Sequence, residues 1–369
     1  MRFVHLLCLP VLLLGGCSTP YSPPILAPDN RPFTGLRELL THNPPPRVVM
    51  IHGMCHHDRA WVEESVTGLA SGLGVPSSPV ELMMDDPQTR VRLYASTLGE
   101  KKPFRVYGIV YSETTKTAKQ RLCPDVSKPT TVCPQPGFRL KRAWVNAFAK
   151  NRLLNDCFAD AVIYFGPSGE QVRRGVLMAL QRIAREEGSS VAPAVLISES
   201  LGSKVLRDTL LMSNAKAGKE AARPLLDIRT LFLAANQIPL LNLGQAAGQT
   251  GAGLVPESPT PAGDVFELLD WLQALRREIL GPGVAPTAVP KPVVVAFTDP
   301  NDLLSYRLTD AQYGNDYTVV NVVVSNAQTW LGLFSNPYTA HTTYLENPDV
   351  MSLIVQGHDS PMTAGEASH

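Results

Sequence analysis

Short apolar runs alternate along most of the chain with longer segments whose apolar residues recur every three or four positions. The short runs are typical of buried strands, and the longer spacing is typical of helices packed on a sheet. The strands predicted in this way cover residues 47–53, 90–96, 104–112, 193–200, 227–236, 291–298 and 317–326. The predicted helices cover residues 61–73, 141–158, 171–188, 201–213, 265–280 and 350–355. The apolar hexamer at 160–165 continues the alternation.

This alternation predicts an α/β fold, in which a mostly parallel sheet carries helices on both faces. The chain has 369 residues, 44% of them hydrophobic, which is enough for a large core. We therefore expect one domain over residues 47–369. Gly, Ala and Pro stretches interrupt the pattern from about 237 to 290 around a single amphipathic helix, so this segment is interpreted as a cap-like insertion over the sheet. No internal repeat is evident.

The charge balance of the chain does not indicate a class of binding partner. Lys plus Arg and Asp plus Glu both number 33, and no long run of one sign occurs. Neither a nucleic-acid groove nor a polybasic membrane patch is predicted from this pattern.

The first residues form an export signal. Arg2 precedes an apolar run from Val4 to Leu14, which is too short to span a bilayer. Residues 1–16 are therefore predicted to be a signal peptide. Leu14-Gly15-Gly16-Cys17 resembles the lipobox of bacterial lipoproteins, and the resemblance implies that Cys17 becomes a lipidated first residue. The alternative is an ordinary cleaved signal peptide that leaves Cys17 as a plain thiol.

The resemblance to lipoproteins implies a location in the bacterial cell envelope, attached to the membrane through the amino terminus. Thr19, where some sorting rules place Asp, favours the outer membrane. Residues 17–46 are rich in proline and are predicted to be a semi-rigid tether, with the folded body beginning near Arg47.

Four cysteines remain once Cys8 and Cys17 are set aside, and four cysteines allow three pairings. Cys123 and Cys133 flank a Pro-rich loop, where a disulfide would stabilise the fold by roughly 3 kcal/mol on the loop-entropy model. Cys55 and Cys157 form the remaining pair. Four buried free thiols are the alternative, and no cysteine spacing typical of zinc is present.

The strongest chemical motif is Ser198-Glu199-Ser200-Leu201-Gly202, between a predicted strand and a predicted helix. A tight turn at this point lifts the Ser200 hydroxyl out of the sheet and leaves backbone N–H groups unused at the start of the helix. The motif resembles G-x-S-x-G, the nucleophile elbow of the α/β-hydrolase superfamily. Ser198 replaces the first Gly with another small residue.

This resemblance implies an oxyanion loop after an earlier strand, and His52-Gly53-Met54 lies at the end of the strand predicted at 47–53. Met54 and Leu201 would donate its two N–H groups. A rival interpretation makes His52, His56, His57 and Asp58 a metal site. Their spacing matches no known zinc motif, because H-x-x-x-H requires a helix and Gly53 follows a strand. His56, His57 and Asp58 are instead expected to line the pocket mouth or cap the next helix.

The superfamily order of Ser, then acid, then His implies a base after Ser200. His341 lies in a predicted loop before the closing helix and is preferred to His358 and His369. Asp302 and Asp299 both follow the strand at 291–298. Asp302 better matches the superfamily spacing and would orient the imidazole, whereas Asp299 is the alternative acid or a turn residue.

The sequence thus predicts a serine hydrolase that cleaves a carboxylic ester through an acyl-enzyme, without a cofactor or metal. The substrate is expected to be a small-molecule or lipid ester, the latter suggested by Trp271 and Leu272 in the insertion. Two alternatives stay open: an acyltransferase that uses the same residues, and a non-catalytic binding or scaffold lipoprotein.

Overall fold

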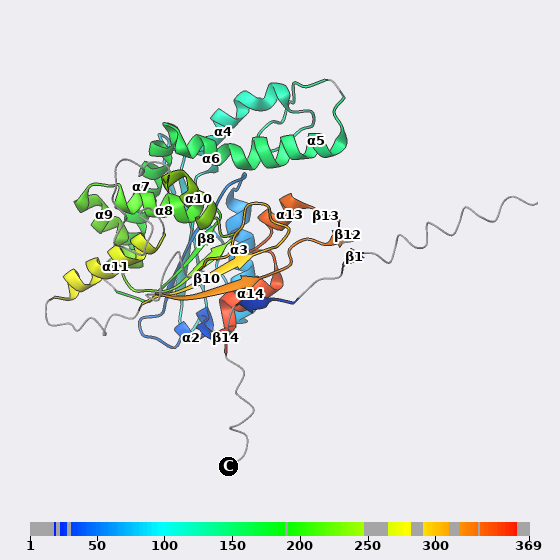
Figure 1. Ribbon diagram of the computed structural model, residues 1–369. Coiled ribbons are helices and arrows are strands. Elements are labelled where there is room, and N and C mark those ends of the chain that lie inside the picture. The colour runs from blue at the N-terminus through cyan, green and yellow to red at the C-terminus, as the bar shows by residue number, and fades with distance from the viewer. Residues whose placement is uncertain are drawn as a thin grey trace, which may run out of the picture.

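A nine-stranded sheet forms the centre of the protein (Figure 1). This computed structural model describes residues 18–19, 23–27, 31–139, 141–188, 191–246, 265–281, 291–309, 317–330 and 333–359. In spatial order the strands are β2 (Ile25–Ala27), β11 (Thr318–Val323), β10 (Val293–Thr298), β9 (Ile228–Ala234), β8 (Ala194–Glu199), β4 (Arg47–Ile51), β7 (Phe104–Val110), β6 (Arg92–Leu98) and β5 (Glu81–Asp85).

The six strands from β11 to β7 are parallel, and antiparallel pairs occur only at the two ends of this sheet: β2 with β11, and β7 with β6 and β6 with β5. Side chains of a strand point alternately to opposite faces. In β4, Val49 and Ile51 accordingly join one apolar cluster, while Val48 and Met50 join another. Both clusters are buried, so both faces of the sheet must be covered.

Helices cover the two faces. The first cluster contains buried residues of α7 (Ser168–Glu187), α8 (Gly202–Leu211), α9 (Ala215–Ala222) and α11 (Val265–Leu280). The second contains those of α2 (Leu36–Leu39), α3 (Arg59–Leu73) and α14 (Pro348–Gln356). The predicted α/β class, a mostly parallel sheet with helices on both faces, is confirmed.

The folded body begins before Arg47, which corrects part of the predicted tether. Phe33, Leu36 and Leu39 are buried in the second cluster. β3 (Phe33–Thr34) pairs with β14 (Gly357–His358). A few apolar residues between prolines are thus enough to join the core. Residues 1–16 and Cys17 lie outside the described residues, whereas β1 (Ser18–Thr19) pairs with β12 (Thr329–Trp330), which in turn pairs with β13 (Phe334–Ser335).

The apolar hexamer at 160–165 is helical, which corrects the alternation predicted there. It belongs to α6 (Ala159–Phe165), which continues α5 (Trp144–Phe148) and the π-type helix η3 (Ala149–Phe158). Ala161 and Tyr164 are buried, whereas Val162 and Phe165 are exposed, a pattern with helical rather than strand period. A run of six residues, five of them apolar, is too short to reveal which period applies.

These helices belong to an arm (residues 112–139 and 141–165) that also contains α4 (Ser112–Lys119) and η2 (Gln120–Asp125). Figure 1 shows the arm above the sheet, with α5 at its tip.

The predicted insertion at 237–290 divides into two described parts. α11 packs against α8, with Leu268, Leu269 and Leu272 in the first cluster, and is therefore part of the helical layer on the sheet. α10 (Ile238–Ala246) also joins this cluster, through Ile238 and Leu241, and in addition lines a pocket described below. The remaining elements are η4 (Arg223–Leu225) and α13 (Pro337–Thr342). Of the helices within the described ranges, none has the length and apolar character needed to cross a bilayer.

Candidate active site

Ser200 occupies a sharp turn between β8 and α8. Its φ angle is 52°, in the left-handed region that residues other than glycine rarely adopt. The backbone N–H of Ser200 donates to the carbonyl oxygen of Ala234 at 2.8 Å, which ties the turn to β9. A Cβ at Gly202 would lie 2.6 Å from the carbonyl oxygen of His52, so glycine is required there. Ser198 fits in the buried position that precedes the turn.

The loop after β4 packs directly on this turn. A Cβ at Gly53 would lie 2.3 Å from Cβ of Ser200 and 2.4 Å from the carbonyl oxygen of Glu199. This close approach explains the glycine of the His-Gly pair. Met54, the next residue, is buried beside it, and Leu201 is the N-cap of α8, where the first N–H groups have no partner within the helix.

The carbonyl group of Gly53 is held by two donors. The hydroxyl of Tyr111 donates to its oxygen at 2.7 Å, and Nδ1 of His52 lies 2.8 Å from the same atom. Because a peptide unit is planar and trans, a carbonyl and the N–H that follows it point to opposite sides. The N–H of Met54 is therefore turned away from Tyr111.

His52 is neutral and is one of the two groups that hold the Gly53 carbonyl. The backbone N–H of Tyr111 donates to its Nε2 at 2.9 Å, which leaves Nδ1 as the protonated atom that donates to Gly53. Burial, followed by the nearby His57, lowers the pKa of His52 well below its ordinary value. Its ring also stacks on Tyr111, with centroids 4.0 Å apart.

The side chains of His341 and Asp302 lie next to Ser200, at the carboxyl ends of the parallel strands. Nε2 of His341 lies 3.2 Å from Oγ of Ser200. Its Nδ1 lies 2.9 and 3.0 Å from the two carboxylate oxygens of Asp302. Tyr344 donates a further hydrogen bond to this carboxylate at 3.0 Å. The three side chains are buried and form a continuous chain of hydrogen bonds.

His341 lies on the short helix α13 rather than in the loop expected for it. Asn336 caps this helix by accepting from the backbone N–H groups of Tyr338 and Thr339, and Pro337 occupies its first turn. Asn-Pro is a favourable helix start that was not recognised in the sequence. A base on a capped helix is held more rigidly than one on a loop.

Asp299 lies in the turn after β10 and, within the part of the chain that the structure describes, is not hydrogen-bonded to His341. Its carboxylate accepts from the backbone N–H of Asn301 at 2.7 Å and of Asn326 at 2.6 Å. Burial raises the pKa of Asp299. The structure thus brings Asp302 to the imidazole and places Asp299 in the turn.

Glu199 is a buried acid that the sequence analysis did not single out. The indole N–H of Trp61 donates to its carboxylate at 3.1 Å, and Nε2 of His57 lies 3.7 Å from the same oxygen. Burial raises the pKa of Glu199 to about 7, and burial lowers that of His57 to about 3. The signal that could have identified it is an acid at the end of a mostly apolar strand, next to Ser200.

The other polar residues of the loop have separate roles. Asp58 caps α3 by accepting from the N–H of Ala60 at 2.8 Å. Burial lowers the pKa of His56. Among the residues described in the structure, no group of three or more His, Cys, Asp or Glu is arranged to hold a metal ion.

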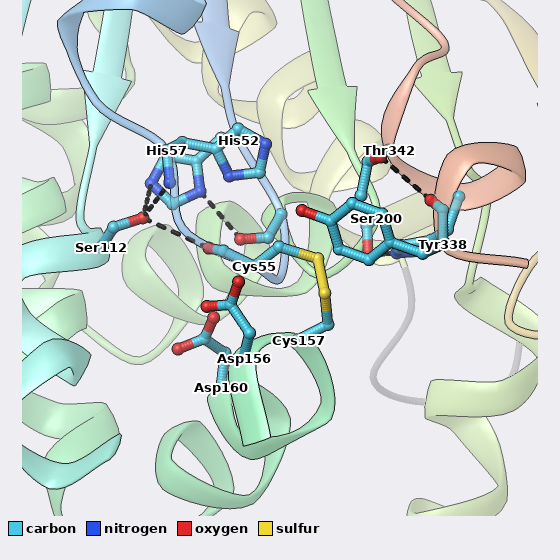
Figure 2. Close-up of a disulfide and its surroundings, with 12 residues drawn as sticks. His52, Cys55, His57, Ser112, Asp156, Cys157, Asp160, Ser200, Tyr338 and Thr342 are labelled. Carbon is cyan, nitrogen blue, oxygen red and sulfur yellow. Dashed lines mark hydrogen bonds between the residues drawn. A yellow bond between two sulfur atoms is a disulfide. The ribbon is translucent and has the colours of Figure 1, made fainter. Parts of the chain in front are cut away.

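Both preferred disulfide pairings are present. Cys123 is bonded to Cys133 within the arm. Cys55, directly after Met54, is bonded to Cys157 in η3. Figure 2 shows this second bridge close to Ser200 and Tyr338. The loop after β4 is thus covalently joined to the arm that lies above it.

An apolar pocket of about 530 Å³ lies beside the site. Two of its lining residues are close in sequence to the site: Met54 lies in the loop after β4, and Leu304 comes two residues after Asp302. The arm and α10 supply most of the other lining residues, which are Phe158, Ala161, Val162, Phe165, Gly166, Gln237, Leu240 and Leu241.

Comparison with known proteins gives structural likenesses only, because no family model and no curated protein matches the sequence. An inhibited esterase B from Lactobacillus rhamnosis is similar with 13% identity and a TM-score of 0.33, over 90% of this chain and 83% of the esterase. A lipase in an open form has 14% identity and a TM-score of 0.26, over 76% and 81%. Acetyl xylan esterase 1 from Thermoanaerobacterium sp. has 9% identity and a TM-score of 0.20, over 74% and 88%. At these values the activities of those proteins do not transfer to this chain.

Proposed function

We propose that this protein is a serine hydrolase of the α/β-hydrolase type that cleaves carboxylic esters. The observation that carries the proposal is the chain of hydrogen bonds from Oγ of Ser200 through His341 to Asp302. A serine needs an adjacent base to become a nucleophile, and the base needs a third group to orient it. All three are in contact here.

In the proposed reaction Oγ of Ser200 attacks the ester carbonyl carbon while Nε2 of His341 takes the hydroxyl proton. Asp302 holds the proton on Nδ1 and stabilises the imidazolium that forms. His341 then donates its new proton to the departing alcohol, which leaves an acyl-enzyme on Ser200. Water, deprotonated by the same imidazole, releases the acid and restores the serine.

The developing oxyanion requires N–H donors, and we assign these to Met54 and Leu201. Each donor of this kind typically contributes about 3 to 4 kcal/mol of transition-state stabilisation. Support comes from the close packing of Gly53 on Ser200 and from the two groups that fix the Gly53 carbonyl.

The pocket favours an ester with an apolar acyl group. Its walls are almost entirely aliphatic and aromatic, and it begins at Met54, next to the position proposed for the reacting carbonyl. Apolar walls with few polar groups select for shape and hydrophobicity rather than for a charged substrate. Acyl lipids and smaller apolar esters both satisfy this description.

Purified protein that begins at Ser18, and its Ser200→Ala variant, should be incubated with a fluorophosphonate probe and with p-nitrophenyl esters of increasing chain length. We expect labelling and turnover in the parent and a loss of about four to six decades of rate in the variant. Folded protein that neither labels nor turns over would overturn the proposal in favour of a non-catalytic lipoprotein. Addition of an alcohol and analysis of the products separates hydrolysis from acyl transfer.

We also propose that Cys17 carries a lipid that attaches the protein to the bacterial envelope, facing the periplasm or the outside. The proposal is supported by the run of residues before Cys17 and by two disulfides, which form and persist in oxidising compartments.

A further inference from the structure

Positive charge is concentrated in one part of the arm, although the whole chain has a formal net charge of zero. Residues 121–152 contain seven basic residues and a single acidic one, Asp125. The basic residues are Arg121, Lys128, Arg139, Lys141, Arg142, Lys150 and Arg152. Each is exposed or half-buried, so this segment presents a basic surface to its surroundings.

The same segment exposes large apolar side chains. Trp144, at the tip of the arm, is 66% exposed, and Val145 beside it is 55% exposed. Farther along the same continuous helix, exposed apolar residues recur at intervals of three and four, which places them on one face. These residues are Leu154, Phe158, Val162 and Phe165.

The exposed apolar face leads into the pocket of the proposed site. Phe158, Val162 and Phe165 are both exposed on the arm and part of the pocket lining. An apolar molecule that lies against this face is therefore in contact with the pocket mouth.

A smaller cavity of about 140 Å³ lies at the tip, with cations and aromatic rings around it. Lys128 and Thr130 come from the disulfide-closed loop, and Arg152 comes from η3. Trp144 and Phe148 are the aromatic residues of the wall, with ring centroids 6.2 Å apart. Two cations and a hydroxyl beside aromatic rings, of which Trp144 is exposed, suit a phosphate whose apolar remainder continues outward.

We propose that this basic and aromatic surface of the arm docks on an anionic phospholipid membrane. Basic side chains would contact the headgroups, and Trp144 and the apolar face would enter the interfacial region, so that the pocket mouth faces the lipid. Interfacial binding combines buried apolar area with attraction to anionic lipids, and both components are present on the arm. A nucleic acid could bind the basic residues, but it would make no use of the exposed apolar face that leads to the pocket.

This docking is separate from the proposed chemistry and from any lipid on Cys17. The test therefore uses protein that begins at Ser18, which retains every described residue. Its binding is measured by flotation with phosphatidylcholine vesicles, alone or mixed with phosphatidylglycerol. We expect binding to the mixed vesicles only, weakened by added salt because Coulomb attraction at a surface is screened.

Two arm variants address the two components. Lys128→Glu/Lys141→Glu is expected to lower affinity for the mixed vesicles by about tenfold or more, because each basic residue near an anionic surface contributes substantially. Its control, Arg185→Glu/Lys216→Glu, makes the same change of charge at exposed positions on α7 and α9 and should bind normally. Trp144→Ala should also weaken binding, whereas Met212→Ala, at an exposed apolar residue outside the arm, should not.

Turnover of a soluble p-nitrophenyl ester by every variant separates this inference from the proposed function. Parent protein that binds vesicles but hydrolyses no ester would contradict the proposed hydrolase function and would still support the docking proposal. Absence of binding to the mixed vesicles, or an equal loss in the arm variant and its charge control, would overturn the docking proposal. So would arm variants that lose affinity for RNA while vesicle binding is unchanged.

Discussion

The hydroxyl oxygen of Tyr111 lies 2.7 Å from the carbonyl oxygen of Gly53 and donates a hydrogen bond to it. Tyr111 follows β7, whereas Gly53 follows the neighbouring parallel strand β4. Adjacent parallel strands end at the same edge of a sheet, so one strand supports the loop that leaves the other. In the proposed mechanism this contact fixes the Met54 N–H, and a group that only holds a donor should affect rate more than substrate binding.

Tyr111→Phe is therefore expected to lower kcat while KM changes little. Complete loss of an oxyanion donor costs about a hundredfold to a thousandfold, so loss of one of its two supports should cost less than this. Steady-state kinetics on a p-nitrophenyl ester gives both constants. Tyr164→Phe is the matched control, because its buried hydroxyl donates to Asp208 at 2.8 Å, away from Ser200. An equal fall in kcat in both variants would show that the effect is merely structural.

Asp302→Asn and Asp299→Asn should have different consequences. The first removes the carboxylate that accepts a hydrogen bond from Nδ1–H of His341, and loss of about four decades in kcat is expected from the wrong imidazole tautomer. The second weakens a turn that binds two backbone N–H groups, so its main effect should be a lower melting temperature. Turnover and thermal unfolding of both variants check this. A greater loss of turnover in Asp299→Asn would reverse the assignment of the acid.

Glu199 should make stability depend on pH near neutrality. Its pKa is raised to about 7 by burial, above its ordinary value of 4.5, so the folded state keeps a proton that the unfolded state releases between these values. The unfolded state then binds fewer protons, and the free energy of unfolding falls as pH rises through this window. Glu199→Gln should flatten the dependence, measured by denaturant unfolding at about pH 5 and about pH 8. Glu64→Gln, at an exposed position on α3, is the control and should keep the parent slope.

Cys17→Ser should prevent lipid attachment when the full chain is expressed in a bacterial host with radiolabelled fatty acid. The parent is expected to carry label and to sediment with membranes, because the modified cysteine supplies the acyl chains. Cys8→Ser, within the predicted signal peptide, is the matched control and should remain labelled. Unlabelled parent protein recovered in the soluble fraction would leave an ordinary cleaved signal as the explanation.

The parts of the site that could be predicted are those that depend on local sequence. Ser200 and Asp302 each follow an apolar strand, and parallel strands bring their carboxyl ends to one edge. Residue order then selected His341. The support provided by Tyr111 and Trp61 could not be predicted, because these contacts to Gly53 and Glu199 join residues 58 and 138 positions apart.

The fold shows the same division between local and distant information. Long periodic segments such as residues 265–280 were predicted with the bounds that the structure has. The hexamer at 160–165 was not, since its five apolar residues fit either period, and its helix depends on continuation from η3. The basic surface of the arm was missed because its charges are scattered along residues 121–152 and are balanced elsewhere in the chain.

Val162→Trp should shift the preferred substrate toward shorter acyl chains. Val162 lies at the mouth of the 530 Å³ pocket and is 61% exposed, so a larger side chain can be added there without displacing the core. The indole would occupy space that the far end of a long chain needs, while short esters would still reach Ser200. The ratio of kcat/KM for long and short p-nitrophenyl esters measures the shift. Val191→Trp, an exposed valine outside the pocket lining, should leave the ratio unchanged. If both variants keep the parent ratio, the acyl chain occupies a different surface, and the apolar pocket does not determine specificity.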